Sequence, residues 1–138
     1  MRIFLLVLIS GICFAKTKFT DRQIASMVPK YFARDHYSPT LNRTKIYGEG
    51  GKKIILLEIQ VNRNRYDGQM EYALSAMASI CSYAKKPFDT FVLVMQSDNP
   101  HLETEQVDAK AKCTIDYFVF KRVKHERWIE KCISLSKL

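Results

Sequence analysis

The sequence predicts an α+β domain, built on a mixed sheet of about four strands that is covered by helices. Three observations carry this prediction. Two runs of strand-forming residues flank a glycine-rich turn, a long alanine-rich helix follows them, and an apolar strand comes soon after that helix. A helix between two strands of one sheet is typical of a right-handed β-α-β crossover, in which both strands run in the same direction.

A short first helix is expected to begin at Thr20. The sequence Thr20-Asp21-Arg22-Gln23 has the form of a capping box, in which the Thr hydroxyl and the Gln side chain satisfy backbone N–H groups at the helix start. Pro29 is expected to end or kink this helix, because proline lacks an N–H donor and clashes with the preceding turn. Residues 34–42 are then expected to form a loop.

A hairpin is predicted from strands at 43–47 and 52–61. The residues between them, Gly48-Glu49-Gly50-Gly51, include glycines that allow the positive φ angles of a tight turn. Side chains alternate across a strand, so one face of the second strand is expected to enter the core. That face carries Ile55, Leu57, Ile59 and Val61.

The longest helix is expected over about 68–85, with Asp67 as its N-cap and Pro87 enforcing its end. Residues 88–95 are β-branched or aromatic for the most part, which predicts a strand buried on both faces. Residues 102–112 fit a helix or a strand, and both alternatives stay open. Residues 114–123 are predicted as a strand by composition, and a last helix is expected from about Lys124.

Residues 1–15 have the features of a signal peptide. A single cation, Arg2, precedes an unbroken apolar run, and the segment ends in Cys13-Phe14-Ala15, which suits signal peptidase. The apolar run is too short to span a bilayer, which needs roughly 20 residues. We therefore expect residues 16–138 to form a single exported domain, periplasmic or secreted, without a transmembrane span after cleavage. The alternative is that the segment is an ordinary buried strand or helix.

Removal of residues 1–15 would change the charge balance and the number of cysteines. Without residues 1–15 the chain keeps 21 Lys and Arg against 14 Asp and Glu, a balance of +7 that favours anionic partners or simply keeps the protein soluble. Three cysteines remain, and in an oxidising compartment an odd number permits one disulfide. Cys113 and Cys132 are the expected pair, whereas Cys81 shares an apolar helix face and is expected to be buried.

The leading candidate binding residues are Arg63 and Arg65. They leave the second strand and enter the start of the long helix, where two guanidinium groups beside unpaired N–H groups form a plausible anion site. Two further clusters have solvated helix surfaces as their ordinary explanation. The first is acidic, with metal binding as its functional alternative, and consists of Asp98, His101, Glu103, Glu105 and Asp108. The second is basic and surrounds Trp128, which we expect in the core; its functional alternative is a surface for nucleic acid or an anionic membrane, and it consists of Lys121, Arg122, Lys124, His125, Arg127 and Lys131.

One family resemblance concerns the hairpin, the long helix and the next strand. Glu58-Ile59-Gln60, then Gln69 and Tyr72, then the apolar strand 91–95 resemble the core of PD-(D/E)xK nucleases over about 45 residues. The resemblance implies a divergent metal-dependent nuclease that uses Glu58. It departs from the family pattern because Gln60 stands at the lysine position and the preceding hairpin offers only Glu49, in its turn.

These observations favour a small exported α+β domain that binds an anionic ligand or a cell-envelope partner and is not an enzyme. The nuclease and a structural or protein-interaction module are the alternatives. The sequence has no recognisable catalytic group, metal-ligand spacing or cofactor motif, so no catalytic residue, metal ligand or cofactor is expected. Nucleic acid is not the favoured partner, and the oligomeric state is left open.

Overall fold

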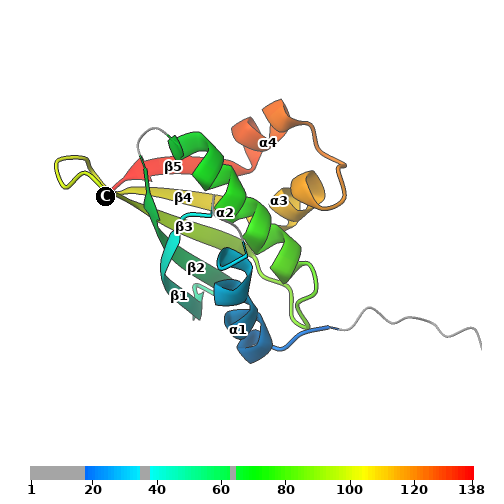
Figure 1. Ribbon diagram of the computed structural model, residues 1–138. Coiled ribbons are helices and arrows are strands. Elements are labelled where there is room, and N and C mark those ends of the chain that lie inside the picture. Colours follow the sequence, from blue (N-terminus) through cyan, green and yellow to red (C-terminus); the bar gives the residue numbers. More distant parts are fainter. Residues whose placement is uncertain (1–17, 35–37, 63–64) are drawn as a thin grey trace, which may run out of the picture.

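The computed structural model describes residues 18–34, 38–62 and 65–138. In this part of the chain the elements follow in the order α1 (Asp21–Phe32), β1 (Thr40–Glu49), β2 (Lys52–Val61), α2 (Tyr66–Cys81), β3 (Thr90–Ser97), β4 (Glu105–Lys110), α3 (Ala111–Phe118), α4 (His125–Lys131) and β5 (Ile133–Lys137). The predicted α+β class is confirmed, with a sheet of five strands (Figure 1). The predicted signal peptide lies outside the described residues.

The sheet is open and mixed, and its strands lie in the order β1-β2-β3-β4-β5. The four helices lie on one face of it, so the fold has two layers (Figure 1). Side chains from that face and from the helices form the main core, whereas a small apolar cluster on the other face holds Ile54, Val92 and Val94. None of the helices in the described residues has the length and apolar composition needed to cross a bilayer.

The predicted hairpin and crossover are both present. Strands β1 and β2 pair antiparallel through a two-residue turn at Gly50 and Gly51, whose φ angles are 60° and 77°. Strand β2 then pairs parallel with β3, and α2 forms the connection between them. Strand β1 begins earlier than expected, because Thr40 and Leu41 continue the ladder beyond an irregularity before Arg43, and the last residues of the expected loop are therefore strand.

The capping box at the start of α1 is confirmed. The N–H of Gln23 donates to the Thr20 hydroxyl at 3.3 Å, and the N–H of Thr20 donates to the Gln23 amide oxygen at 2.9 Å. The expectation that the helix ends at Pro29 is wrong, since α1 continues to Phe32. Val28 and Phe32 lie one turn apart and are both buried, so packing against the core holds the turn that follows the proline.

The ends of α2 also differ from the prediction. Arg65, and not Asp67, is the N-cap, and Asp67 lies in the first turn, where its negative charge favours the exposed N–H groups of the helix. The helix ends at Cys81, before the residue predicted from Pro87. From there an extended connection reaches β3, and Ala84 in it forms a bridge with Phe19.

The segment after β3 settles one open alternative and overturns one prediction. Within 102–112 the strand alternative holds, because β4 occupies Glu105–Lys110. The strand predicted over 114–123 is wrong, since α3 begins directly after β4 at Ala111. Helical spacing places Ala111 and Thr114 on one buried face, and this lets Thr114 meet the core side chain of Trp128.

The last helix is confirmed, but it is shorter than expected and a final strand follows it. Trp128 in α4 is fully buried, donates its indole N–H to the Thr114 hydroxyl at 3.2 Å and stacks on Tyr117 with ring centroids 4.6 Å apart. Strand β5 pairs with β4 at the edge of the sheet. It is mostly exposed and alternates Ser134, Leu135 and Ser136, so it lacks the apolar run that predicts a strand.

Two neighbouring leucines of β2 test which face of the sheet carries the main core. Leu57 is fully buried under the helices, and Leu57→Ala is expected to lower the free energy of unfolding by about 2 to 5 kcal/mol because it leaves a cavity. Leu56 belongs to the small cluster on the open face, and Leu56→Ala should cost less. Urea denaturation of both variants checks this, and a larger loss for Leu56→Ala would contradict the two-layer packing.

Candidate functional site

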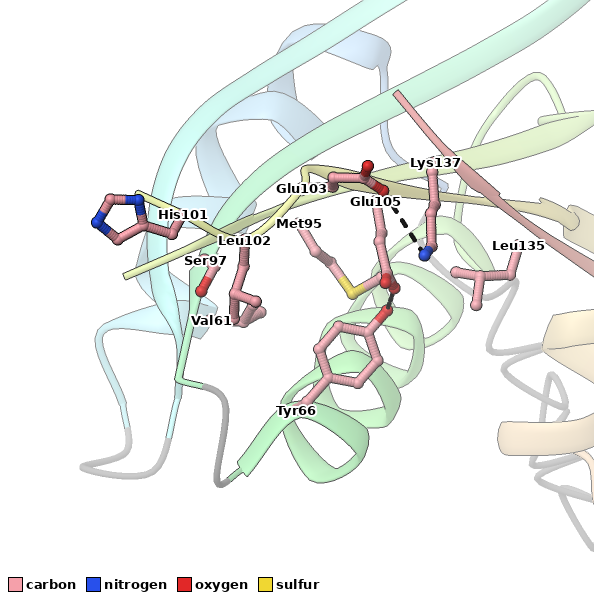
Figure 2. Close-up of a pocket in the computed structure, with 10 residues that line it drawn as sticks. All are labelled: Val61, Tyr66, Met95, Ser97, His101, Leu102, Glu103, Glu105, Leu135 and Lys137. Carbon is pink, nitrogen blue, oxygen red and sulfur yellow. Dashed lines mark hydrogen bonds and ion pairs between the residues drawn. The ribbon is translucent and has the colours of Figure 1, made fainter. Parts of the chain in front are cut away.

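One cavity lies where the parallel strands β2 and β3 end (Figure 2). The carboxyl ends of parallel strands meet at the same edge of a sheet, where open sheets commonly bind ligands. The volume of this cavity is about 650 Å³. Val61 and Met95 are buried in its wall, whereas Leu102 and Leu135 leave 39% and 57% of their surface exposed.

The polar side chains of this cavity come from α2, the end of β3, β4, β5 and the connection before β4. The Tyr66 hydroxyl donates a hydrogen bond to the Glu105 carboxylate, and Lys137 forms an ion pair of 3.6 Å with Glu103, both side chains being well exposed (Figure 2). Burial raises the pKa of Tyr66, and the hydrogen bond and charge of Glu105 raise it further. Tyr66 is therefore a neutral hydrogen-bond donor at neutral pH.

The acidic cluster singled out in the sequence is divided by the fold. His101, Glu103 and Glu105 line the cavity, whereas Asp98 and Asp108 are not among its lining residues. The remaining lining residues were not predicted as site residues. Tyr66 begins α2 and Lys137 ends β5, a strand that the sequence does not predict, so no local pattern links either residue to the cluster.

A second cavity, of about 820 Å³, is strongly basic. It lies at the other end of β4, among α3, α4 and the segment that connects these helices. Among the described residues that line it, Asp116 is the one acidic residue, and five are cations: Lys110, Lys112, Arg122, Lys124 and Arg127. The last three belong to the basic cluster found in the sequence. Lys110 and Lys112 lie in residues 102–112, where the sequence fits a helix or a strand, so it does not predict which way their side chains face.

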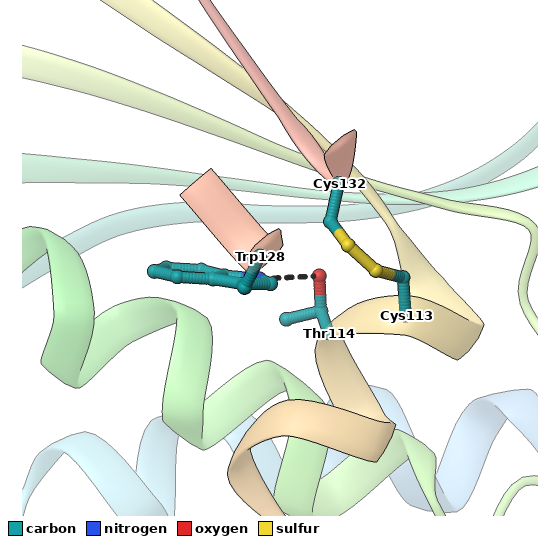
Figure 3. Close-up of a disulfide and its surroundings, with 4 residues drawn as sticks. All are labelled: Cys113, Thr114, Trp128 and Cys132. Carbon is teal, nitrogen blue, oxygen red and sulfur yellow. Dashed lines mark hydrogen bonds between the residues drawn. A yellow bond between two sulfur atoms is a disulfide. The ribbon is translucent and has the colours of Figure 1, made fainter. Parts of the chain in front are cut away.

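A disulfide forms part of the wall of the basic cavity (Figure 3). Cys113 in the first turn of α3 is bonded to Cys132, directly after α4, so the expected pairing is confirmed. The Lys110 N–H donates to the Cys132 carbonyl at 2.8 Å and holds the end of β4 to the same point. The buried bond between Trp128 and Thr114 lies beside the disulfide and joins the same two helices (Figure 3).

The segment between α3 and α4 positions Arg122. Lys121 has a φ of 56°, in the left-handed region that non-glycine residues rarely adopt. After this turn the Arg122 N–H donates to the Asp116 carbonyl at 2.8 Å, and the guanidinium carbon lies 4.8 Å from the centroid of the Phe120 ring. A cation held over an aromatic ring keeps its charge while losing part of its conformational freedom. Arg122 is thus held at the cavity by its own backbone and a neighbouring ring.

The predicted arginine pair is only partly described. Arg63 lies outside the described residues. Arg65 is exposed at the start of α2, and its N–H donates to the Asn62 carbonyl at 2.9 Å. Arg65 is not among the residues that line either of the two cavities.

The residues that resemble the nuclease core make structural contacts. The Glu58 carboxylate accepts a hydrogen bond from the Gln96 amide and lies 3.7 Å from the Arg43 side chain, which stands opposite it on β1. Gln69 accepts the N–H of Asn62 at 2.7 Å and so joins α2 to the end of β2. Among the described residues no group of three His, Cys, Asp or Glu side chains could hold a metal ion.

Comparison with known proteins adds no family. No protein-family model matches the chain, and searches of curated proteins and of solved structures find no significant match.

The raised pKa of Tyr66 predicts a dependence of stability on pH. Above the ordinary tyrosine pKa of 10.0, the unfolded chain releases a proton that folded Tyr66 retains, so the free energy of unfolding falls as pH rises. In Tyr66→Phe this fall should be shallower. Urea denaturation at pH 9 and pH 11 measures the difference, and equal slopes in the two proteins would contradict the burial of the hydroxyl.

The disulfide is expected to stabilise the C-terminal third of the chain. It closes a loop with a sequence separation of 19, for which the loss of chain entropy in the unfolded state corresponds to about 3 kcal/mol. Dithiothreitol should therefore lower the urea midpoint of the wild type. The double variant Cys113→Ala/Cys132→Ala is the control, because the reductant should leave its midpoint unchanged. Equal responses would show that the bond adds no stability.

Proposed function

We propose that this protein is an exported binding protein, not an enzyme, and that it binds a multiply charged anion in the basic cavity. Ligands of this chemistry carry several phosphate or sulfate groups, on a small molecule or on a component of the cell envelope. Phosphate and sulfate suit arginine and lysine because both side chains donate several charge-assisted hydrogen bonds.

The observation that carries the proposal is the convergence of five cations on one cavity from β4, α3, α4 and the connection between the two helices. In the described part of the chain none of these five side chains forms an ion pair with a carboxylate. Like charges around one cavity repel each other, so their arrangement costs free energy that a bound anion offsets. Asp116 alone cannot balance them.

The disulfide supports the proposed export. Disulfides persist in oxidising compartments and are rare in the cytosol, where thiols are kept reduced. The Cys113–Cys132 bond borders the basic cavity. In an oxidising compartment this bond stays intact, and so does the part of the cavity wall that it forms.

Heparin, a sulfated polyanion, is the probe for the proposed site. The double variant Lys124→Gln/Arg127→Gln removes two exposed cations of the cavity and is expected to elute from immobilised heparin at clearly lower salt than the wild type. The matched control is Lys30→Gln/Lys52→Gln, which removes the same charge from exposed positions on α1 and at the hairpin.

The predicted arginine pair is tested in the same assay with Arg63→Gln/Arg65→Gln. A loss of retention in this variant that exceeds the loss in the lysine control would locate anion binding at the start of α2. Equal shifts in all three double variants would mean that heparin responds only to net charge, and this result would overturn the proposed site.

A further inference from the structure

Glu105 carries a charge that the described part of the chain does not balance. Its side chain is half-buried in the cavity at the ends of β2 and β3, and its one polar contact among the described residues is the Tyr66 hydroxyl. A neutral hydroxyl supplies a hydrogen bond but no positive charge. Removing a carboxylate from water is costly unless a cation pairs with it. The cavity therefore has an unmet preference for a cation.

The lysine that lines this cavity pairs with another carboxylate. Lys137 stands opposite Glu105 in the β4–β5 ladder, but its ammonium group pairs with Glu103 (Figure 2). That pair is exposed at the rim, with 71% and 64% of the two side chains accessible, so water screens it. His101 lies at the far end of the cavity from Glu105 (Figure 2). The half-buried carboxylate thus stays open to a partner from solution.

The walls around Glu105 are apolar. Val61 and Met95 form buried surface, and Leu102 and Leu135 are two of the few large apolar side chains that the fold leaves exposed. Exposed apolar surface beside a cavity favours a ligand with an apolar body. Met95 stands opposite Glu105 in the β3–β4 ladder and lines the cavity, and its thioether side chain adapts to aliphatic and aromatic groups alike (Figure 2).

We propose that this cavity is a second binding site, specific for a small organic ammonium ion with a compact apolar body. The ammonium group donates a charge-assisted hydrogen bond to Glu105, on the side of the carboxylate that Tyr66 leaves free. The apolar body covers Met95, Val61 and the two exposed leucines. Recognition at this end of the sheet is opposite in charge to the anion binding proposed at the other end, and it does not depend on that proposal.

The probe is 2-phenylethylammonium, and its neutral counterpart of the same shape is 2-phenylethanol. Isothermal titration calorimetry of the wild type should show binding of the amine and at least tenfold weaker binding of the alcohol. Glu105→Gln keeps an acceptor for the Tyr66 hydroxyl but removes the charge, so it should weaken amine binding at least tenfold and leave the alcohol unaffected. Lys137→Met removes the cation that pairs with Glu103 at the rim and so makes the cavity more negative, which should strengthen amine binding.

Glu49→Gln is the matched control, because it removes the same charge from the last residue of β1, beside the hairpin turn and at the opposite end of β2 from the cavity. It should leave the affinity for the amine unchanged. The wild-type comparison of amine and alcohol decides the proposal even if Glu105→Gln fails to fold. Equal affinities for amine and alcohol, no binding of the amine, or the same loss in Glu49→Gln as in Glu105→Gln would each overturn it.

Discussion

The parallel pairing of β2 and β3 is the constraint on which the rest of the structure depends. Parallel neighbours need a crossover connection, and α2 supplies it while covering the two central strands. Because of this pairing, Val61 and Ser97 end their strands side by side, and the chain after each strand must leave from the same edge. The first cavity lies at that edge, between the start of α2 and the residues that follow β3.

Strand β4 then separates two cavities of opposite charge. Glu105 begins this strand in the partly acidic cavity, and Lys110 ends it in the basic one. Five residue steps along an antiparallel strand span about 17 Å, so the two charges barely influence each other in physiological salt. The basic end is held by more contacts. There the disulfide and the Trp128–Thr114 hydrogen bond join α3 to α4, and the left-handed turn at Lys121 connects the two helices.

The sequence predicted those parts of the fold whose signals are local. Glycine at 50 and 51 specifies the hairpin turn, the Thr20 box specifies the start of α1, and the alternation in 52–61 specifies the buried face of β2. The sequence did not predict the secondary structure of segments that tertiary contacts determine. Residues 114–118 have strand-like composition, yet they form a helix because Thr114 must reach Trp128 and Cys113 must reach Cys132. The cavities combine residues from strands and helices distant in the chain, and no local pattern links Tyr66 to Glu105.

Cys81, the free cysteine of the described residues, bears on the chemistry of the disulfide. Cys81 lies in the core on α2, and burial raises the pKa of its thiol to about 12, so the reactive thiolate is scarce at neutral pH. Exchange between a thiol and a disulfide requires that the thiolate reach a sulfur atom of the bond. In the folded protein Cys81 therefore does not exchange with the disulfide. Incorrect disulfide pairing is confined to the chain before it folds.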